Sequence, residues 1–192
     1  MTTVDAPTSA VVTDAITLTS ITALREGETR NGQDADFSGA DIWYRTPEIF
    51  SRRFEQLSQE VRLAGTSERL DWLVGAFYAD EDLYAREGMR FGADYETYFS
   101  LVLSGAAGAP NPAFISTLPG FGAPGTNYAP GTGADDTHEQ DSKSLAFFTN
   151  NSFRVTDQLE LTAGLRYTTE EKDLYTQYRN IGGAVGCADA LN

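Results

Sequence analysis

The chain has 192 residues, 41% of them hydrophobic, which is enough for one domain with a core. Its 28 acidic residues outnumber its 14 basic residues, so the formal net charge is −14 and the pI is near 4.3. This charge repels phosphate, and we expect no nucleic acid partner. No stretch reaches the roughly 20 consecutive apolar residues of a membrane-spanning helix.

The first expected strand covers about residues 15–25, where threonine and isoleucine favour extended backbone. Apolar side chains such as Ile16, Leu18 and Leu24 share one parity there, as they do on one side of a strand. Residues 26–52 are polar and carry scattered aromatic side chains, including Trp43 and Tyr44. We expect this segment to be a long loop.

The segment 54–64 fits two secondary structures. Phe54, Leu57 and Val61 follow helical spacing, with Gly65 as a helix C-cap. Leu57 and Val61 also share strand parity with Leu63. Periodicity alone does not decide between helix and strand.

Two hairpins follow from clearer patterns. A strand over 70–82 comes after a short connector, Gly65 to Arg69, with the composition of a tight turn. Strands over 144–154 and 159–172 flank a second short connector, 155–158. From Leu159 to Tyr167 apolar residues alternate strictly with polar residues or glycine, so one face of this strand needs an apolar medium and the other a polar one.

A connector of about residues 84–142 separates the two hairpins and is rich in glycine and proline. Loops of this length are uncommon in compact domains and are usually functional or disordered. Short turns at one end of a sheet and long loops at the other are typical of outer-membrane barrels. Aromatic residues at the loop-side strand ends then form an interfacial girdle: Phe77, Tyr78, Tyr84, Tyr167 and Tyr175.

At these residues the chain resembles the barrel of TonB-dependent outer-membrane receptors. The resemblance lies in residues 54–63 (FEQLSQEVRL), 70–78 (LDWLVGAFY), 159–167 (LELTAGLRY) with the tail 170–172 (EEK), and 18–23 (LTSITA). It favours strand for 54–64. It implies an all-β fold: an antiparallel, up-and-down transmembrane barrel of 22 strands with long external loops, in the outer membrane of a Gram-negative type of cell.

The resemblance also implies a function, the active uptake of a large, scarce nutrient such as an iron chelate (for example a siderophore), cobalamin or an oligosaccharide. The expected partners are lipid, this ligand and the TonB energy-coupling complex, which acts through a plug domain inside the barrel. Neither a plug domain nor a TonB-contacting box is recognisable in residues 1–192. We expect the chain to be a barrel fragment or a truncated product that does not transport by itself, because an unclosed sheet leaves two edges unpaired.

The resemblance further implies that Glu160, Thr162 and Arg166 point into the barrel, where Arg166 could pair with an acid on the plug. The alternative is that they are solvated polar positions on an ordinary sheet. Residues 84–142 are expected to form part of the external mouth where ligand first binds.

Other motifs carry weaker predictions. Gly120–Gly125 matches G-x-G-x-x-G but follows no expected strand and contains a proline, so we expect a loop and no nucleotide site. The acidic segment Asp135–Asp141 with His138 could offer ligands to a cation, but a solvated loop is the simpler interpretation. Acid pairs in Asp80–Asp82 and at Glu170 and Glu171 are expected at strand ends above the membrane. Cys187, the one cysteine, excludes a disulfide within the chain.

We therefore expect no catalytic, cofactor-binding or metal-binding residues and no enzyme. A second functional class stays open, a soluble β-sandwich that binds carbohydrate through aromatic residues such as Trp43 and Tyr44. In a sandwich the hairpins bury their apolar faces against each other, so Trp72 and Leu161 lie in a dry interior.

Overall fold

The computed structural model describes residues 2–13 and 15–182. The chain divides into two compact units, each made of three segments. The first unit comprises Met1–Glu28, Arg53–Tyr84 and Glu139–Tyr175, and the second comprises Thr29–Arg52, Ala85–His138 and Thr176–Asn192.

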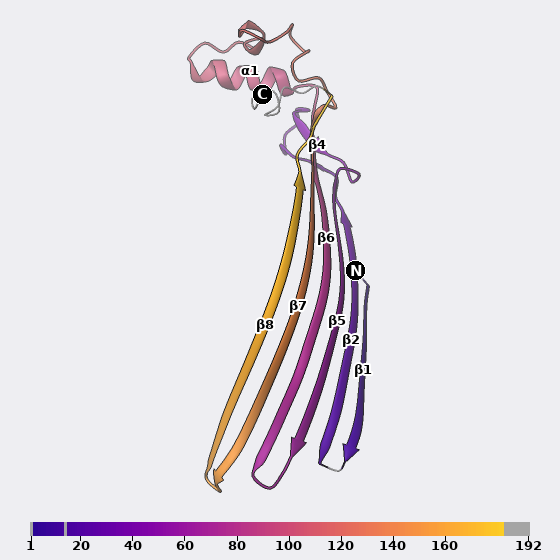
Figure 1. The fold of residues 1–192 in the computed structure, drawn as a ribbon. Helices are drawn as coiled ribbons and strands as arrows, with labels where there is room; N and C mark the ends of the chain where they lie inside the picture. Colours follow the sequence, from indigo (N-terminus) through magenta and orange to yellow (C-terminus); the bar gives the residue numbers. More distant parts are fainter. Residues whose placement is uncertain (1, 14, 183–192) are drawn as a thin grey trace. The chain divides into compact units, whose positions relative to one another are not determined.

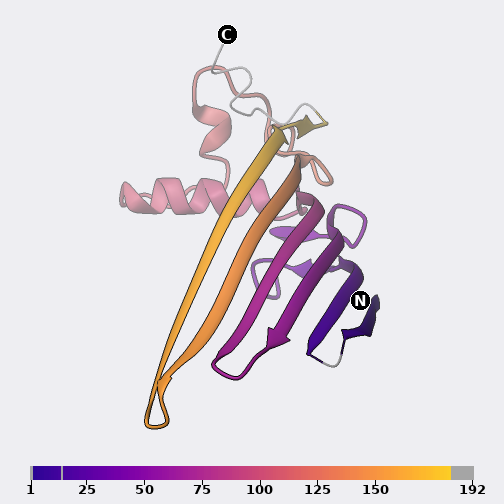
Figure 2. The same ribbon diagram turned by 60° about the horizontal axis from the view of Figure 1, so that its bottom comes forward.

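The first unit is a sheet of long strands in the order β1-β2-β5-β6-β7-β8 (Figures 1 and 2). The bounds of these strands, several of which continue into the second unit, are β1 Thr2–Thr13, β2 Ile16–Arg30, β5 Phe50–Thr66, β6 Leu70–Phe91, β7 Gly133–Thr156 and β8 Leu159–Gln177. β1 and β2 pair antiparallel from Thr2↔Glu26 to Val11↔Thr17, with a register shift before Thr13. Short turns join β5 to β6 and β7 to β8, inside the connectors that the sequence predicts.

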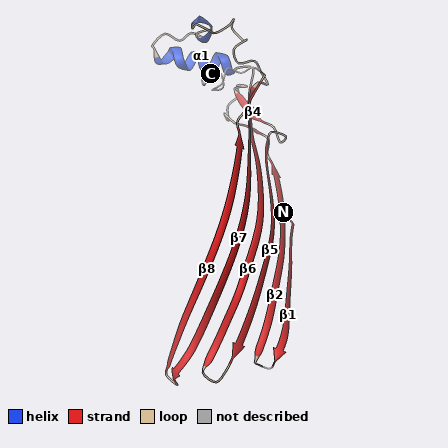
Figure 3. Ribbon diagram, viewed as in Figure 1, coloured by secondary structure: helices blue, strands red, loops and turns tan. Residues whose placement is uncertain are grey.

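The all-β prediction is confirmed, and residues 54–64 lie in a strand rather than a helix. Figure 3 shows strands as the main element of the chain. In the first unit the described residues form only strands and turns, so no second layer of this unit covers either face of its sheet. The buried apolar residues of this unit are small: Ala23, Ala79 and Ala146. Large apolar side chains stay exposed, and Leu161 is 59% exposed.

Two glycines leave room for aromatic rings that extend from neighbouring strands. A Cβ atom on Gly75 of β6 would come within 2.3 Å of the Phe148 ring, and one on Gly65 of β5 within 2.6 Å of the Trp72 ring. Each ring therefore covers the backbone of the adjacent strand where a side chain is missing.

The second unit contains the short elements β3 Gln33–Asp34, β4 Trp43–Arg45, α1 Tyr95–Ala106, η1 Ile115–Thr117 and β9 Asn180–Ile181. β4 pairs with the end of β6 at Trp43↔Phe91, and β9 pairs with the start of β7 at Gly133↔Ile181. Its buried apolar residues are Ile42, Ile49, Ala85 and Ile115.

Several expected boundaries are wrong. The long connector is shorter than 84–142, because β6 continues to Phe91 and β7 starts at Gly133, and its interior contains α1. β6 and β7 pair with each other, and β4 and β9 pair with their last and first two residues, respectively, although the sequence of these ends is charged. The expected loop 26–52 contains β3, β4 and the ends of β2 and β5. Strand β1 was not expected, and it includes Pro7, a residue that cannot donate a hydrogen bond to a neighbouring strand.

The contact between Gly75 and Phe148 predicts a position-specific effect of added volume. Gly75→Ala should lower the free energy of unfolding by about 1–3 kcal/mol, because the ring must leave its place. Gly164→Ala is the control, since its Cβ would meet no heavy atom closer than 3.4 Å. Urea unfolding followed by circular dichroism measures both variants; equal effects would contradict the role given to the ring contact.

Candidate lipid-facing surface

Contacts between neighbouring strands identify which residues share a face of the first unit. The Thr22 hydroxyl donates to Gln59 Oε1 at 2.5 Å, and Gln59 Nε2 donates to the Ser20 hydroxyl at 2.8 Å. Even-numbered residues of β2 therefore share a face with odd-numbered residues of β5. Trp72 lies over Gly65, so even-numbered residues of β6 are on that same face.

The opposite face is identified in the same way. Phe148 lies over Gly75, and the Ser152 and Thr162 hydroxyls are 2.6 Å apart. Even-numbered residues of β7 and β8 therefore share a face with odd-numbered residues of β6. We call this the polar face, and the other the apolar face.

The apolar face carries exposed aliphatic and aromatic side chains on every long strand of the unit. On it lie Val4, Leu18, Leu24, Leu57, Val61, Val74, Tyr78, Leu145, Phe147, Phe153, Val155, Leu159, Leu161, Leu165 and Tyr167. Within β2, β5, β6 and β8 these residues are the ones that share strand parity in the sequence. The sequence assigned no parity to β7, and β1 was not expected. A soluble domain rarely exposes an apolar surface of this extent.

This apolar band has a limited height along each strand. The segments Leu70–Tyr78 and Leu159–Tyr167 each span about nine residues, the length that a tilted strand needs to cross a hydrocarbon layer. Both segments end in a tyrosine, 37% exposed at Tyr78 and 66% at Tyr167. An amphipathic ring at the border of an apolar band is the arrangement found at membrane interfaces.

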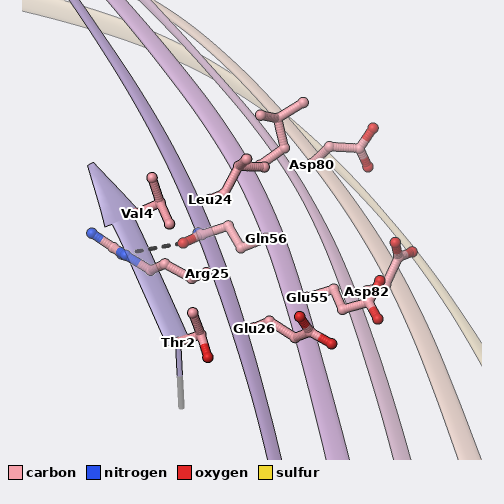
Figure 4. Close-up of a pocket in the computed structure, with 10 residues that line it drawn as sticks. Thr2, Val4, Leu24, Arg25, Glu26, Glu55, Gln56, Asp80 and Asp82 are labelled. Atoms are coloured by element: carbon pink, nitrogen blue, oxygen red, sulfur yellow. Dashed lines mark hydrogen bonds between the residues drawn. The ribbon is translucent and has the colours of Figure 1, made fainter. Parts of the chain in front are cut away.

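Beyond the tyrosines the same face becomes acidic. Asp80, Asp82, Asp141, Glu171 and Asp173 line one depression, with Lys143 as the only cation among its lining residues. A second depression brings Glu55, Asp80 and Asp82 next to Val4 and Leu24 of the first two strands (Figure 4). The apolar region of β6 therefore ends between Tyr78 and Asp80.

On the polar face, charged side chains are mostly paired with one another. Arg62 pairs with Glu60 of the same strand, Arg154 with Asp71 at 3.5 Å, and Lys172 with Glu170 at 2.9 Å. The pairs Arg154–Asp71 and Lys172–Glu170 are exposed and each contributes little to stability, while Glu60 is partly buried. They show a face suited to water or to a polar protein surface.

The three residues expected on one side of the last strand, Glu160, Thr162 and Arg166, do lie on the polar face. The Arg166 guanidinium is 5.7 Å from the centre of the Phe77 ring and 5.6 Å from that of Phe148, within the range of cation–π contacts. It also donates to the Thr168 hydroxyl at 3.2 Å. The suggested pairing of Arg166 with an acid outside this chain stays a prediction.

In the second unit, one buried carboxylate holds the loop that follows α1. Glu96 accepts hydrogen bonds from the backbone N–H groups of Gly125 at 2.9 Å, Asn127 at 3.0 Å and Tyr128 at 3.3 Å, and from Asn127 Nδ2 at 3.0 Å. Burial raises the pKa of Glu96, but these hydrogen bonds outweigh it and lower the pKa below its ordinary value. The carboxylate is therefore charged at neutral pH.

Two serines extend this contact along the same side of the helix. The Ser100 hydroxyl accepts from the N–H of Ile115 at 3.3 Å, and the Ser104 hydroxyl accepts from the N–H of Asn111 at 2.7 Å. The three side chains are four residues apart and are 6%, 0% and 1% exposed, respectively. We call Glu96, Ser100 and Ser104 the polar row of α1.

Two aromatic side chains of this helix, Tyr95 and Phe99, form a cluster with the rings of Trp43, Phe91 and Tyr128. Ring centres of Phe91 and Tyr95 are 4.1 Å apart, and those of Trp43 and Tyr95 are 6.2 Å apart. Trp43, which the sandwich hypothesis uses for carbohydrate binding, thus contributes to the packing of the unit, and its Nε1 is buried without a hydrogen-bond partner.

The structure also places the weaker motifs. Within Gly120–Gly125, the N–H of Gly122 donates to Asn127 Oδ1 at 2.6 Å and that of Gly125 donates to Glu96, so neither amide is free to bind phosphate. Asp80–Asp82 lies in β6, and Glu170 and Glu171 lie in β8.

The acidic segment Asp135–Asp141 lies in β7 rather than in a loop, so that part of the prediction is wrong. Asp135 is buried and forms a two-point ion pair with Arg86, at 2.7 and 2.5 Å. Among residues 2–13 and 15–182, no group of three or more acidic, histidine or cysteine side chains is placed to hold a metal ion. Cys187 lies outside the described residues.

The geometry at Glu96 predicts how the loop 111–128 responds to loss of the carboxylate. Glu96→Gln replaces two acceptor oxygens by one and should leave buried N–H groups without a partner, at a cost of about 1–3 kcal/mol. Hydrogen exchange of the Asn127 and Tyr128 amides should then become roughly 10- to 100-fold faster. Because the folded pKa of Glu96 is lowered, this stabilisation is present above the unfolded pKa of about 4.3 and is lost as the pH falls through the folded pKa.

Glu87→Gln provides the control, since Glu87 is partly exposed and pairs with Arg52 at 2.8 Å. It should leave the amides of 111–128 unchanged. Equal protection of these amides in the Glu96 variant would rule out the anchoring role of the carboxylate.

Among the described residues, no helix is both long and apolar enough to cross a bilayer. Comparison of the chain with protein-family models, with curated proteins and with solved structures finds no match.

Proposed function

We propose that this chain forms part of the membrane-spanning wall of an outer-membrane barrel, in a transporter of the TonB-dependent type. The observation that carries the proposal is the apolar face of the first unit. It carries exposed apolar side chains on each long strand, interrupted by a few polar residues such as Thr22 and Gln59. On β6 and β8 it is about nine residues high and is bordered by a tyrosine and then by carboxylates. Water is an unfavourable medium for such a face, whereas acyl chains are a favourable one.

The energetic argument is simple. Removing a leucine, valine or phenylalanine side chain from water is worth about 1.5–3 kcal/mol. Leu161, Leu165 and Phe147 are 59%, 73% and 55% exposed, and other large apolar side chains on the same face are also exposed. Contact with lipid recovers this free energy without a second protein layer, and the backbone polar groups stay paired within the sheet.

The open edges support a larger assembly. Every residue described in β1 is exposed, as is every residue of β8 except Thr176. Unpaired backbone groups at such edges are not tolerated in hydrocarbon, so further strands must pair with both. The TonB-dependent type is supported by the sequence resemblance and by the short turns and long connector; uptake of a large, scarce nutrient is part of the same proposal.

The soluble sandwich is less well supported. It requires Trp72 and Leu161 to lie in a dry interior between two layers. In the described part of the first unit, the strands form one layer and Leu161 faces no partner layer.

A pair of adjacent substitutions tests the lipid contact. Ala163 lies near the middle of the apolar band, and Thr162 lies next to it on the polar face. Arginine in the bilayer midplane costs about 2–4 kcal/mol, so Ala163→Arg should reduce insertion into phospholipid vesicles by roughly 30-fold or more. Thr162→Arg adds the same charge and should have little effect.

Vesicle flotation, together with protection of the strands from protease, measures the inserted fraction. If the chain stays in solution as a monomer and neither substitution changes the fraction bound to vesicles, the proposal is wrong and a soluble domain is supported instead. Equal losses for both variants would contradict the assignment of the two faces.

The transport part of the proposal is tested separately in cells. Deletion of the gene should abolish the uptake of one class of nutrient among ferric chelates, cobalamin and oligosaccharides. Deletion of TonB should give the same loss, because the energy for release comes through that complex. Unchanged uptake of all three classes would exclude the transporter and leave the lipid contact intact.

A further inference from the structure

Asn31 and Gly32 join β2 to β3 in the second unit, and they form the one Asn-Gly pair of the chain. Both residues are exposed and lie outside the strands. The asparagine side chain and the main-chain nitrogen that follows it are therefore both accessible to water.

An asparagine followed by glycine is open to attack by its own backbone. The main-chain nitrogen of the next residue is close enough to the side-chain Cγ atom to close a five-membered ring with it. A Cβ atom on that next residue hinders the approach, and glycine has none. Glycine also adopts a wider range of backbone angles, which favours closure of the ring. The sequence thus places the least hindered backbone nitrogen directly after Asn31.

The fold leaves both reacting groups unbonded. Among the described residues, no acceptor takes a hydrogen bond from the Gly32 N–H, and the Asn31 carboxamide has no partner. The flanking backbone is fixed instead: the Asn31 N–H donates to the Phe50 carbonyl at 3.0 Å, and the Ala35 N–H donates to the Trp43 carbonyl at 3.1 Å. A bonded N–H must break its hydrogen bond before the nitrogen can lose its proton. At Gly32 no such bond has to break.

The other asparagines in the described part of the chain are protected. Asn111 precedes Pro112, which has no N–H to deprotonate. Asn127 is 9% exposed, its Nδ2 donates to Glu96, and the N–H of Tyr128 is bonded to the same carboxylate. The others lie in strands and precede residues that carry a side chain: Asn150, Asn151 and Asn180.

We propose that Asn31 is a site of spontaneous deamidation. The Gly32 nitrogen gives up its proton to water or hydroxide and attacks Asn31 Cγ; a C–N bond forms, and the side-chain nitrogen leaves as ammonia. The cyclic imide then takes up one water molecule at either of its two carbonyl groups. One opening gives an aspartyl residue, and the other gives an isoaspartyl residue, in which the main chain runs through the former side chain. Water is the only co-reactant, and nothing is oxidised or reduced.

The isoaspartyl product alters the hairpin that follows. It adds one carbon to the main chain directly before β3, where Gln33 pairs with Arg45. A longer main chain between the Phe50 contact and this pair disturbs the register of β3 against β4. We therefore expect the Ala35 amide to exchange faster in the isoaspartyl form. The inference concerns the second unit alone and does not depend on contact with lipid.

Mass spectrometry of aged protein tests the site. The full chain is incubated at mildly alkaline pH, both folded and in urea, and is sampled over time. Digestion after glutamate at acidic pH gives the peptide 29–48, whose one asparagine is Asn31, and the peptide 97–139, which contains Asn111 and Asn127. Deamidation raises the mass of a peptide by about 1 Da, and an isoaspartate-specific methyltransferase labels the isoaspartyl product.

We expect the peptide 29–48 of the folded chain to react at least about tenfold faster than the peptide 97–139, because its nitrogen is unhindered and unbonded. In urea the rate at Asn31 should change by less than about threefold, since the fold does not protect it, whereas the rate at Asn127 should rise. A rate at Asn31 that is as low as that at Asn127 in the folded chain would overturn the proposal. So would a rate at Asn31 that rises in urea as steeply as the rate at Asn127.

Three substitutions test the route. Asn31→Gln lengthens the side chain and should suppress the mass gain of the peptide 29–48. Gly32→Ala introduces a Cβ 3.0 Å from Pro47 Cδ and should slow the reaction about tenfold, whereas Gly39→Ala, whose Cβ would meet nothing within 4 Å, should not change the rate. Protection of the Ala35 amide shows in each variant that the hairpin is intact. An undiminished mass gain in Asn31→Gln, or equal rates in the two alanine variants, would contradict attack by the Gly32 nitrogen.

Discussion

The constraint on which the other features depend is that the described strands of the first unit form a single layer. A sheet buries an apolar face against another sheet, a helix or a lipid phase. Here the described strands of the unit form one layer, so Leu161, Leu165 and Phe147 have no protein partner within it. The limited height of the apolar band, the tyrosines at its border and the acids beyond it all match a medium that is itself a thin layer. Interpreting the chain as part of a barrel wall follows from this constraint more than from any single residue.

Much of the sheet could be predicted from the sequence, because apolar and polar residues alternate in a strand that has one apolar and one polar face. The strict alternation of 159–167 and the two short connectors identified both hairpins and the faces of β8. Residues 54–64 were ambiguous, since Leu57 and Val61 fit both periods, and only pairing with neighbouring strands determines the outcome. The ends of β6 and β7 could not be predicted, because β4 and β9, distant in sequence, supply their partners.

The helix α1 and its polar row were missed for a different reason. Helix prediction relies on apolar residues that face the protein, and here the buried side is polar. Glu96, Ser100 and Ser104 occur at intervals of four residues, which places them on one side of a helix. This spacing predicts a helix only if the buried side is assumed to carry hydrogen-bond acceptors for a neighbouring backbone. The uncharged segment from Thr97 to Ala134 was visible as rich in glycine and proline, and that composition concealed the helix inside it.

Attachment through main-chain amides affects which amino-acid substitutions the connector between β6 and β7 can tolerate in evolution. Glu96, Ser100 and Ser104 hold the segment 111–128 by N–H groups, which every amino acid except proline supplies. Ile115, Asn127 and Tyr128 still help to maintain the shape of that segment through their side chains, but its exposed positions, such as Ala123, do not. Substitutions at these exposed positions can accumulate with little loss of structure, so a surface of this kind can diversify its chemistry while the scaffold beneath it stays the same.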